Sequence, residues 1–269
     1  MSLARIALRT AAVEAIKGRT LVGDNVLDSP NGALDIQADG TLRTDEDRPF
    51  VAVYTDIATA GDVTGRDLTE NGSCVLVIEI GISMAMTELD RETGRSTIVG
   101  VSVPASDRAF EFFLEIVQKQ VLDALTDPDS DWADIFRALH SHVEKIEVGT
   151  RRTSDNGQKL AGHQTRITMA LFPDPARGAP LDGRAPLARF LAALEAENDP
   201  TYEAQAQAMR SVIGGAVPDW KQVQIRHGLT RAELRALGSG PIISDESRVT
   251  PPLKGASVAI EGVGQREVP

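Results

Sequence analysis

The strongest pattern in the chain is an alternation of residue types between Gly72 and Met86, in the stretch GSCVLVIEIGISMAM. One face of this stretch is entirely apolar, with Leu76, Ile78, Ile80, Ile82 and Met84. The other face is mixed, with Val75, Val77, Glu79, Gly81 and Ser83. A period of two predicts a β-strand, and at ~3.3 Å per residue about 13 residues extend ~40 Å, which is longer than most strands. We therefore expect this strand to cross the middle of a sheet or to extend beyond its own subunit.

Other alternating runs predict the partners of this strand. Residues 97–104 follow the turn-forming stretch TELDRETGRS, and we interpret them as the return arm of a β-hairpin with the long strand. A short strand is predicted at residues 49–55. Residues 146–148 and 163–172 predict a last pair of strands, joined by the polar tip RRTSDNGQ.

Three stretches with apolar residues at helical spacing predict helices. The first covers residues 3–17 and ends at Gly18. Ser106 and Asp107 can cap the second, whose apolar positions are Phe110, Phe113, Leu114, Val117, Val121 and Leu125. The third begins at Asp131, and its apolar face consists of Trp132, Ile135, Phe136, Leu139 and Val143.

These elements predict an α+β fold for residues 1–173, in which a mostly antiparallel sheet with a long β-hairpin carries helices packed on one face. Residues 23–48 are rich in turn formers and are predicted to be a long loop. Prolines at 173, 175 and 180 mark a boundary. Residues 174–269 are predicted to be a C-terminal, mainly helical extension that ends in an extended tail.

Composition narrows the class of protein. The chain has 269 residues, 42% of them hydrophobic, and a net charge of −11. An acidic protein is not expected to grip nucleic-acid phosphates tightly, although DNA can pass through a channel that repels it. Cys74 is the single cysteine, and we expect it to be buried in the long strand. No apolar run has the length of a membrane span and no signal-peptide pattern opens the chain, so we expect a soluble, intracellular product.

The sequence contains no motif that indicates a catalytic, cofactor or metal site. His140 and His142 are two positions apart, so on a helix they would point away from each other and form a solvated pair near its C-terminus. The acidic stretches TDEDRP and DPDSDWAD lack the ligand order of a calcium loop and are expected to solvate loops and cap helices. Nucleophile-elbow, Walker and dinucleotide-binding patterns are absent from the sequence.

Residues 219–238 have the pattern of a helix-turn-helix. His227 and Gly228 can form the turn, and the stretch from Thr230 to Glu233 is a capping box that opens the second helix. The cations in this segment near the second helix are Arg226, Arg231 and Arg235. A DNA-reading helix would be more basic, so a structural helical hairpin or docking module is favoured.

The layout up to residue 173 resembles the tail terminator family of long-tailed bacteriophages, the lambda-type ring-forming tail completion proteins. The stretches that carry this resemblance are LRTAAVEAI, PFVAVYTD, CVLVIEIGIS, FFLEIVQKQVLDALTDPDSDWADIF and VEKIEVGTRRTSDNGQKLAGHQTRITMALF. The resemblance lies in the order of the helices and strands and in the pattern of hydrophobic residues, not in an invariant motif. It leaves the loop at 23–48 and the C-terminal extension unexplained.

The resemblance implies a structural virion protein of the tail or neck, assembled in the host cytoplasm and without catalysis or cofactor. A homo-hexameric ring would cap the tail tube protein, stop its polymerisation and offer a surface to the head–tail connector, while DNA passes through the lumen. The predicted hairpin tips carry Arg91, Arg95, Arg151 and Arg152. In a ring these arginines are candidate interface residues that pair with carboxylates of a neighbour.

Three other functions stay open from the sequence. One is a different neck protein, a head–tail stopper or connector. Another is a DNA-binding regulator that uses residues 219–238, and the last is an enzyme whose site the sequence does not reveal.

Overall fold

The structure is a computed structural model that describes most of the chain, namely residues 2–30, 35–36, 42–43, 46–61, 66, 68–83, 86–89, 96–98, 101–104, 106–153, 160–215, 217–238, 256–260 and 264–268. The chain divides into two compact units, Met1–Leu229 and Thr230–Pro269. The first unit holds the central sheet and most of the helices. The second contains α7 (Arg231–Ala236) and a pair of strands, β11 (Ala256–Ile260) and β12 (Gly264–Val268).

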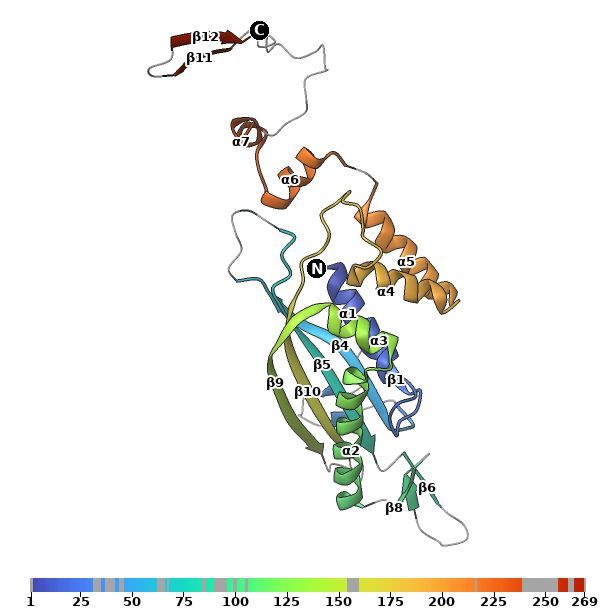
Figure 1. The fold of residues 1–269 in the computed structure, drawn as a ribbon. Coiled ribbons are helices and arrows are strands. Elements are labelled where there is room, and N and C mark those ends of the chain that lie inside the picture. Colours follow the sequence, from blue (N-terminus) through green and yellow to red (C-terminus); the bar gives the residue numbers. More distant parts are fainter. Residues whose placement is uncertain are drawn as a thin grey trace. The chain divides into compact units, whose positions relative to one another are not determined.

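A five-stranded sheet forms the centre of the first unit (Figure 1). Its strands, in spatial order, are β1 (Val26–Asp28), β4 (Phe50–Thr59), β5 (Ser73–Ser83), β10 (Leu160–Leu171) and β9 (His140–Thr153). The β1–β4 pair is parallel and the other three pairs are antiparallel. The predicted α+β class with a mostly antiparallel sheet is confirmed.

Strand β5 lies in the middle of this sheet, as its sequence predicts. It pairs with β4 on one side and with β10 on the other. Every residue from Leu76 to Ser83 is buried, including Glu79 of the mixed face, which is 7% exposed. Cys74 is a buried free cysteine, as expected. The apolar side chains of β5 belong to one core with those of β4, β10 and the first three helices.

The predicted hairpin between residues 72–86 and 97–104 is wrong. In the described part of this segment, β7 (Ser96–Ile98) and β8 (Val101–Pro104) pair with each other, and β7 also pairs with β6 (Thr87–Leu89), in a separate small sheet. Both edges of β5 are already occupied by β4 and β10, so no edge is left for a return arm. The long hairpin of this fold is instead formed by β9 and β10, as predicted for the last pair of strands.

Helices α1 (Leu3–Ile16), α2 (Asp107–Thr126) and α3 (Asp131–Ala138) follow the predicted starts. Serine side chains cap them: Ser2 accepts from Arg5 N, Ser106 from Ala109 N and Ser130 from Ala133 N. Helix α1 packs on β1 and β4, α2 on β5 and β10, and α3 on β9. Burial of their apolar sides fixes the helices on the sheet.

The third helix is shorter than predicted. Leu139 closes it, and Val143 lies in β9 instead of on the helix face. The reason is the strand pairing, because His140 is already paired with Leu171 and the Phe172 amide donates to the Leu139 carbonyl oxygen at 3.2 Å.

Residues 23–48, predicted to be a loop, contain three short strands within their described part. They are β1, which joins the central sheet, and the two-residue strands β2 (Asp35–Ile36) and β3 (Leu42–Arg43). After the sheet come several helices, as predicted: α4 (Pro186–Ala196), α5 (Pro200–Ile213) and α6 (Asp219–His227). Helix α4 packs on α1 and α3, so its apolar side chains join the core of the first unit.

The pairing of β4 with β5 depends on a close approach between Gly81 and the Phe50 ring, which are direct cross-strand partners. A Cβ atom on residue 81 would lie 2.4 Å from Phe50 Cζ. We expect Gly81→Ala to lower the free energy of unfolding by about 1–3 kcal/mol, because the fully buried ring has little room to move. Denaturant unfolding measures this change.

A matched control is Gly149→Ala in β9, where an added Cβ meets nothing within 4 Å. It is expected to change stability by less than about 0.5 kcal/mol. Adding Phe50→Leu to Gly81→Ala should recover part of the loss, because the smaller side chain makes room for the new methyl group. Equal stabilities of Gly81→Ala and Gly149→Ala would contradict this account.

Candidate functional site

Strand β9 lies at one edge of the central sheet and exposes a long surface. Strand β9 is 14 residues long, and among the described strands it pairs with β10 alone. Every residue from Ser141 to Thr150 is exposed. The outer edge of β9 therefore offers a row of backbone N–H and C=O groups that can pair with another chain.

Three apolar side chains of β9 form an uncovered stripe, which consists of Val143, Ile146 and Val148. They are 44%, 54% and 53% exposed. Their direct partners on β10 are Met169, Ile167 and Thr165, which are buried, at 0%, 4% and 2% exposed. Because direct partners lie on the same face of a sheet, the stripe continues the buried face of β10 past the point where the helices cover it.

The other face of β9 is polar. Glu147 pairs with Lys145 at 2.8 Å, and Glu144 accepts a hydrogen bond from Ser73 Oγ at 2.5 Å. The pairing with β10 shifts register near Ser141 and near Glu144, which indicates two β-bulges. Bulges and charged side chains are ways in which proteins limit unwanted pairing at a sheet edge. Strand β9 has both features, and its apolar stripe is nevertheless exposed.

The arginines predicted to lie at the interface fall near this strand only in part. Arg151 and Arg152 lie near the end of β9, opposite Gly162 and Ala161 of β10. Arg91 and Arg95 lie outside the described residues. The apolar stripe was not singled out from the sequence, although Val143, Ile146 and Val148 are all visible in it.

A buried polar network lies on the opposite face of the sheet, around Glu79 of β5. Glu79 Oε1 accepts hydrogen bonds from Tyr54 Oη at 3.0 Å and from Gln164 Nε2 at 2.7 Å. Nearby, Arg166 donates to Asp56 at 2.8 Å. Burial, and then the negative charge of Glu79, raise the pKa of Tyr54 to about 12. These groups satisfy one another, which favours a structural role in joining β4, β5 and β10.

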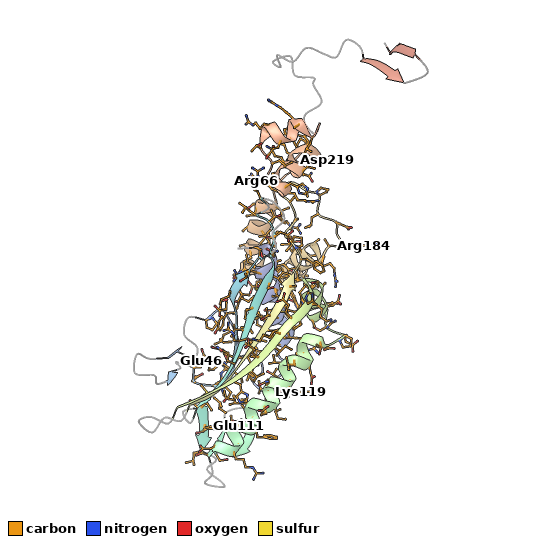
Figure 2. The ribbon with its side chains drawn as sticks, turned by 90° about the vertical axis from the view of Figure 1, so that its left-hand side faces the viewer. Glu46, Arg66, Glu111, Lys119, Arg184 and Asp219 are labelled. Atoms are coloured by element: carbon orange, nitrogen blue, oxygen red, sulfur yellow. The ribbon has the colours of Figure 1, made fainter. Side chains whose placement is uncertain are left out.

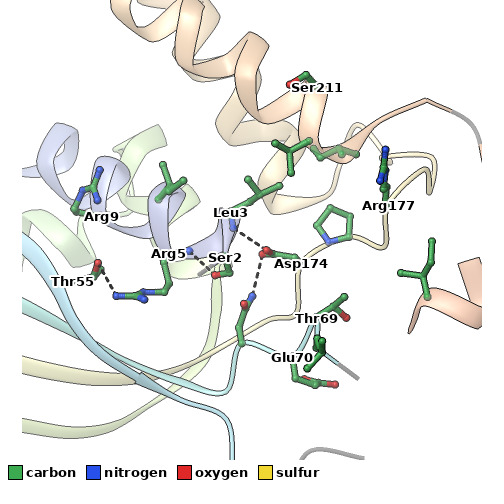
Figure 3. A pocket seen from close by; sticks show the side chains of 17 residues that line it. Ser2, Leu3, Arg5, Arg9, Thr55, Thr69, Glu70, Asp174, Arg177 and Ser211 are labelled. Carbon is green, nitrogen blue, oxygen red and sulfur yellow. Dashed lines mark hydrogen bonds between the residues drawn. The ribbon is translucent and has the colours of Figure 1, made fainter. Parts of the chain in front are cut away.

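A hollow of about 630 Å³ lies beside the start of α1 (Figure 3). Several of its polar groups are engaged within the protein. Asp174 accepts hydrogen bonds from the amides of Leu3 and Ala4 at 2.8 and 3.0 Å, and from Asn71 Nδ2 at 3.1 Å. Arg5 donates to Thr55 Oγ1 and to the Asp56 carbonyl oxygen. Asp174 therefore caps α1 and ties it to the segment after β10.

Several of the polar groups that the sequence raised as metal candidates have structural partners among the described residues. His140 lies half-buried at the start of β9, not solvated as predicted, and its Nδ1–H donates to the Phe136 carbonyl oxygen at 3.1 Å. Burial lowers the pKa of His140. In the second acidic stretch, Asp127 pairs with Arg19, and Asp134 pairs with Arg189 at 2.6 Å. These carboxylates bind arginines of neighbouring segments.

Within the described residues, the structure gathers another group that could hold a metal ion: Glu111, Glu115 and His163. Sequence reasoning did not find it. The spacing of Glu111 and Glu115, four residues apart on a helix, was visible, but the partner histidine comes from a strand almost fifty residues later.

None of the helices in the described part of the chain combines the length and apolar character that a bilayer-spanning helix needs.

The tyrosine network can be tested by a spectroscopic titration, because Tyr54 and Tyr202 are the only tyrosines of the chain. Burial and hydrogen bonding to Glu14 also raise the pKa of Tyr202. In the folded protein we expect almost no tyrosinate absorbance at pH 10, where an unfolded chain is half ionised. Since the unfolded chain releases protons first, stability should fall as pH rises from about 10 to 12.

The variant Tyr202→Phe isolates the titration of Tyr54, and Glu79→Gln in that background should lower the pKa of Tyr54 towards 10. Circular dichroism at each pH shows whether the protein is still folded. Half-developed tyrosinate absorbance at pH 10 in a folded Tyr202→Phe protein would contradict the network.

A scan of the chain against models of known protein families found no match, and a search among curated proteins found no similar sequence.

Proposed function

We propose that this protein is a structural subunit that assembles through β9 into a ring, in the manner of the tail terminators of long-tailed bacteriophages that its sequence resembles. The observation that carries the proposal is the long edge strand β9 with its apolar stripe. An exposed edge combined with apolar side chains on the core face is a surface that a second subunit can complete.

The sequence expectation placed the contact in a ribbon formed by residues 72–103. Because β5 lies in the centre of the sheet, that ribbon does not exist, and the proposed contact moves to β9. The β9–β10 hairpin supplies what the proposal needs. It is long, one of its strands is an integral part of the sheet, and its outer strand is exposed over ten consecutive residues from Ser141 to Thr150.

Ring closure sets a geometric condition on the contact. If β9 paired with β9 of a second copy, the contact would be two-fold and would stop at a dimer. A ring instead requires a head-to-tail contact, in which β9 of each subunit meets a different surface of the next subunit. The proposal is therefore a head-to-tail contact, and a dimer as the largest species counts against it.

In the proposed setting the ring would cap the tail tube and join it to the head–tail connector, with DNA passing through the lumen. The net charge of −11 per subunit suits such a passage, because a negative wall repels the phosphate backbone and does not hold it. No catalysis or cofactor is part of the proposal.

The stripe gives a direct test of assembly. The double variant Ile146→Lys/Val148→Lys introduces two charges where the neighbouring subunit would cover apolar side chains. We expect it to weaken association about 10-fold or more, because buried unpaired charges are costly, while the fold of the subunit is unchanged since both positions are exposed. Light scattering after size exclusion, over a range of concentrations, measures the association.

A matched control is Val212→Lys, the same kind of change at a 63% exposed valine of α5. It should leave association as in the original protein. Electron microscopy of the original protein should show rings, six times the 28.8 kDa of the chain if the ring is a hexamer. A protein that stays monomeric or dimeric at every concentration, or a double variant that associates like Val212→Lys, would overturn the proposed contact.

A further inference from the structure

Two carboxylates and one imidazole converge at the end of the sheet where β10 begins. Glu111 and Glu115 are four residues apart on α2, so they lie on the same side of that helix. His163 comes from β10. One ligand atom from each of the three lies within 4.8 Å of the other two, and His163 Nε2 is 3.6 Å from Glu111 Oε1. Figure 2 shows Glu111 near the start of α2.

His163 has the burial and the orientation of a ligand. Its side chain is 1% exposed, and its Nε2 is a buried atom without a hydrogen-bond partner. Its other ring nitrogen, Nδ1, lies 3.1 Å from Gln118 Oε1. An amide oxygen only accepts hydrogen bonds, so Nδ1 carries the proton. In the neutral ring, Nε2 therefore directs a lone pair towards the two glutamates.

Each of these three groups can donate an electron pair, so a single cation can bind all of them. We propose that Glu111, Glu115 and His163 bind a divalent transition-metal ion of the zinc class. Zinc binds histidine nitrogen and carboxylate oxygen at about 2.0–2.2 Å, so donor atoms around it lie roughly 3.3–3.6 Å apart. The distance between His163 and Glu111 already matches this spacing.

The donor set selects among cations. Calcium and magnesium prefer oxygen ligands throughout, whereas an imidazole nitrogen favours zinc and its neighbours in the first transition row. Glu115 is exposed, so its carboxylate can move the short distance needed to complete the site. Its side of the site also faces water, which can take the remaining coordination positions.

Gln118 acts as the supporting residue of this site. Metal-bound histidines commonly donate their second ring N–H to an oxygen acceptor, which fixes the tautomer and the orientation of the ring. Gln118 Oε1 fills that role from the same helix that carries both glutamates. A bound ion would therefore fasten the first half of α2 to the β9–β10 hairpin, whatever the function of the protein.

The test is calorimetric titration of Zn²⁺ into the full chain after treatment with a chelator, with Ca²⁺ as a second titrant. We expect one Zn²⁺ per chain, no comparable response to Ca²⁺, and a rise in melting temperature on adding Zn²⁺ that a chelator reverses. Glu115→Gln, at an exposed position that leaves folding intact, should lower the Zn²⁺ affinity by about 10-fold or more.

Two controls separate this site from surface binding. Glu203→Gln removes an exposed carboxylate from α5, and His142→Asn removes an exposed histidine from β9, and both should bind Zn²⁺ like the original protein. Absence of Zn²⁺ binding would overturn the proposal. Loss of binding in His142→Asn, or an unchanged affinity in Glu115→Gln, would overturn it as well.

Discussion

A β-strand that is paired on one side only leaves half of its backbone hydrogen-bonding groups open on the other, and among the described strands β9 is in this position at the edge of the central sheet. The open edge is long, and the apolar stripe Val143, Ile146 and Val148 lies along it. Burial of the open edge alone, or of the apolar stripe alone, would stabilise an assembly only modestly. Together they form a surface on which backbone pairing and apolar burial reinforce each other, and for that reason the proposed assembly is centred on this strand.

The rest of the first unit holds β9 in place. Strand β10 is paired along its length with both β5 and β9, so the edge strand is attached to the most deeply buried strand of the fold through one intermediate. Helix α2 packs on β5 and β10, and Asp174, just after β10, caps the start of α1. The position of the edge therefore depends on the core, while its chemistry depends on the few side chains that the core leaves uncovered.

The sequence was informative where the signal is local. The alternation in 72–86 correctly predicted a central strand, Ser106 and Asp107 correctly predicted the start of α2, and the start of α3 at Asp131 was also correct. The sequence patterns predicted the wrong strand pairing where the partner is distant in the chain, because β5 pairs with β10 and not with the adjacent run at 97–104. The apolar stripe could not be recognised from the sequence for the same reason. Only the pairing with buried residues of β10 shows that its three side chains lie on the core face of the sheet. Glu111 and Glu115 are a visible pair, but only the fold brings His163 to them.

The central claim is that another subunit covers the outer edge of β9, and backbone hydrogen–deuterium exchange measures this most directly. Exchange is compared between dilute, dissociated protein and concentrated, assembled protein. The account predicts slower exchange on assembly for the amides of residues 141–150, while those of the central strand β5 stay slow in both states. Unchanged exchange in residues 141–150, with new protection confined to other segments, would contradict it.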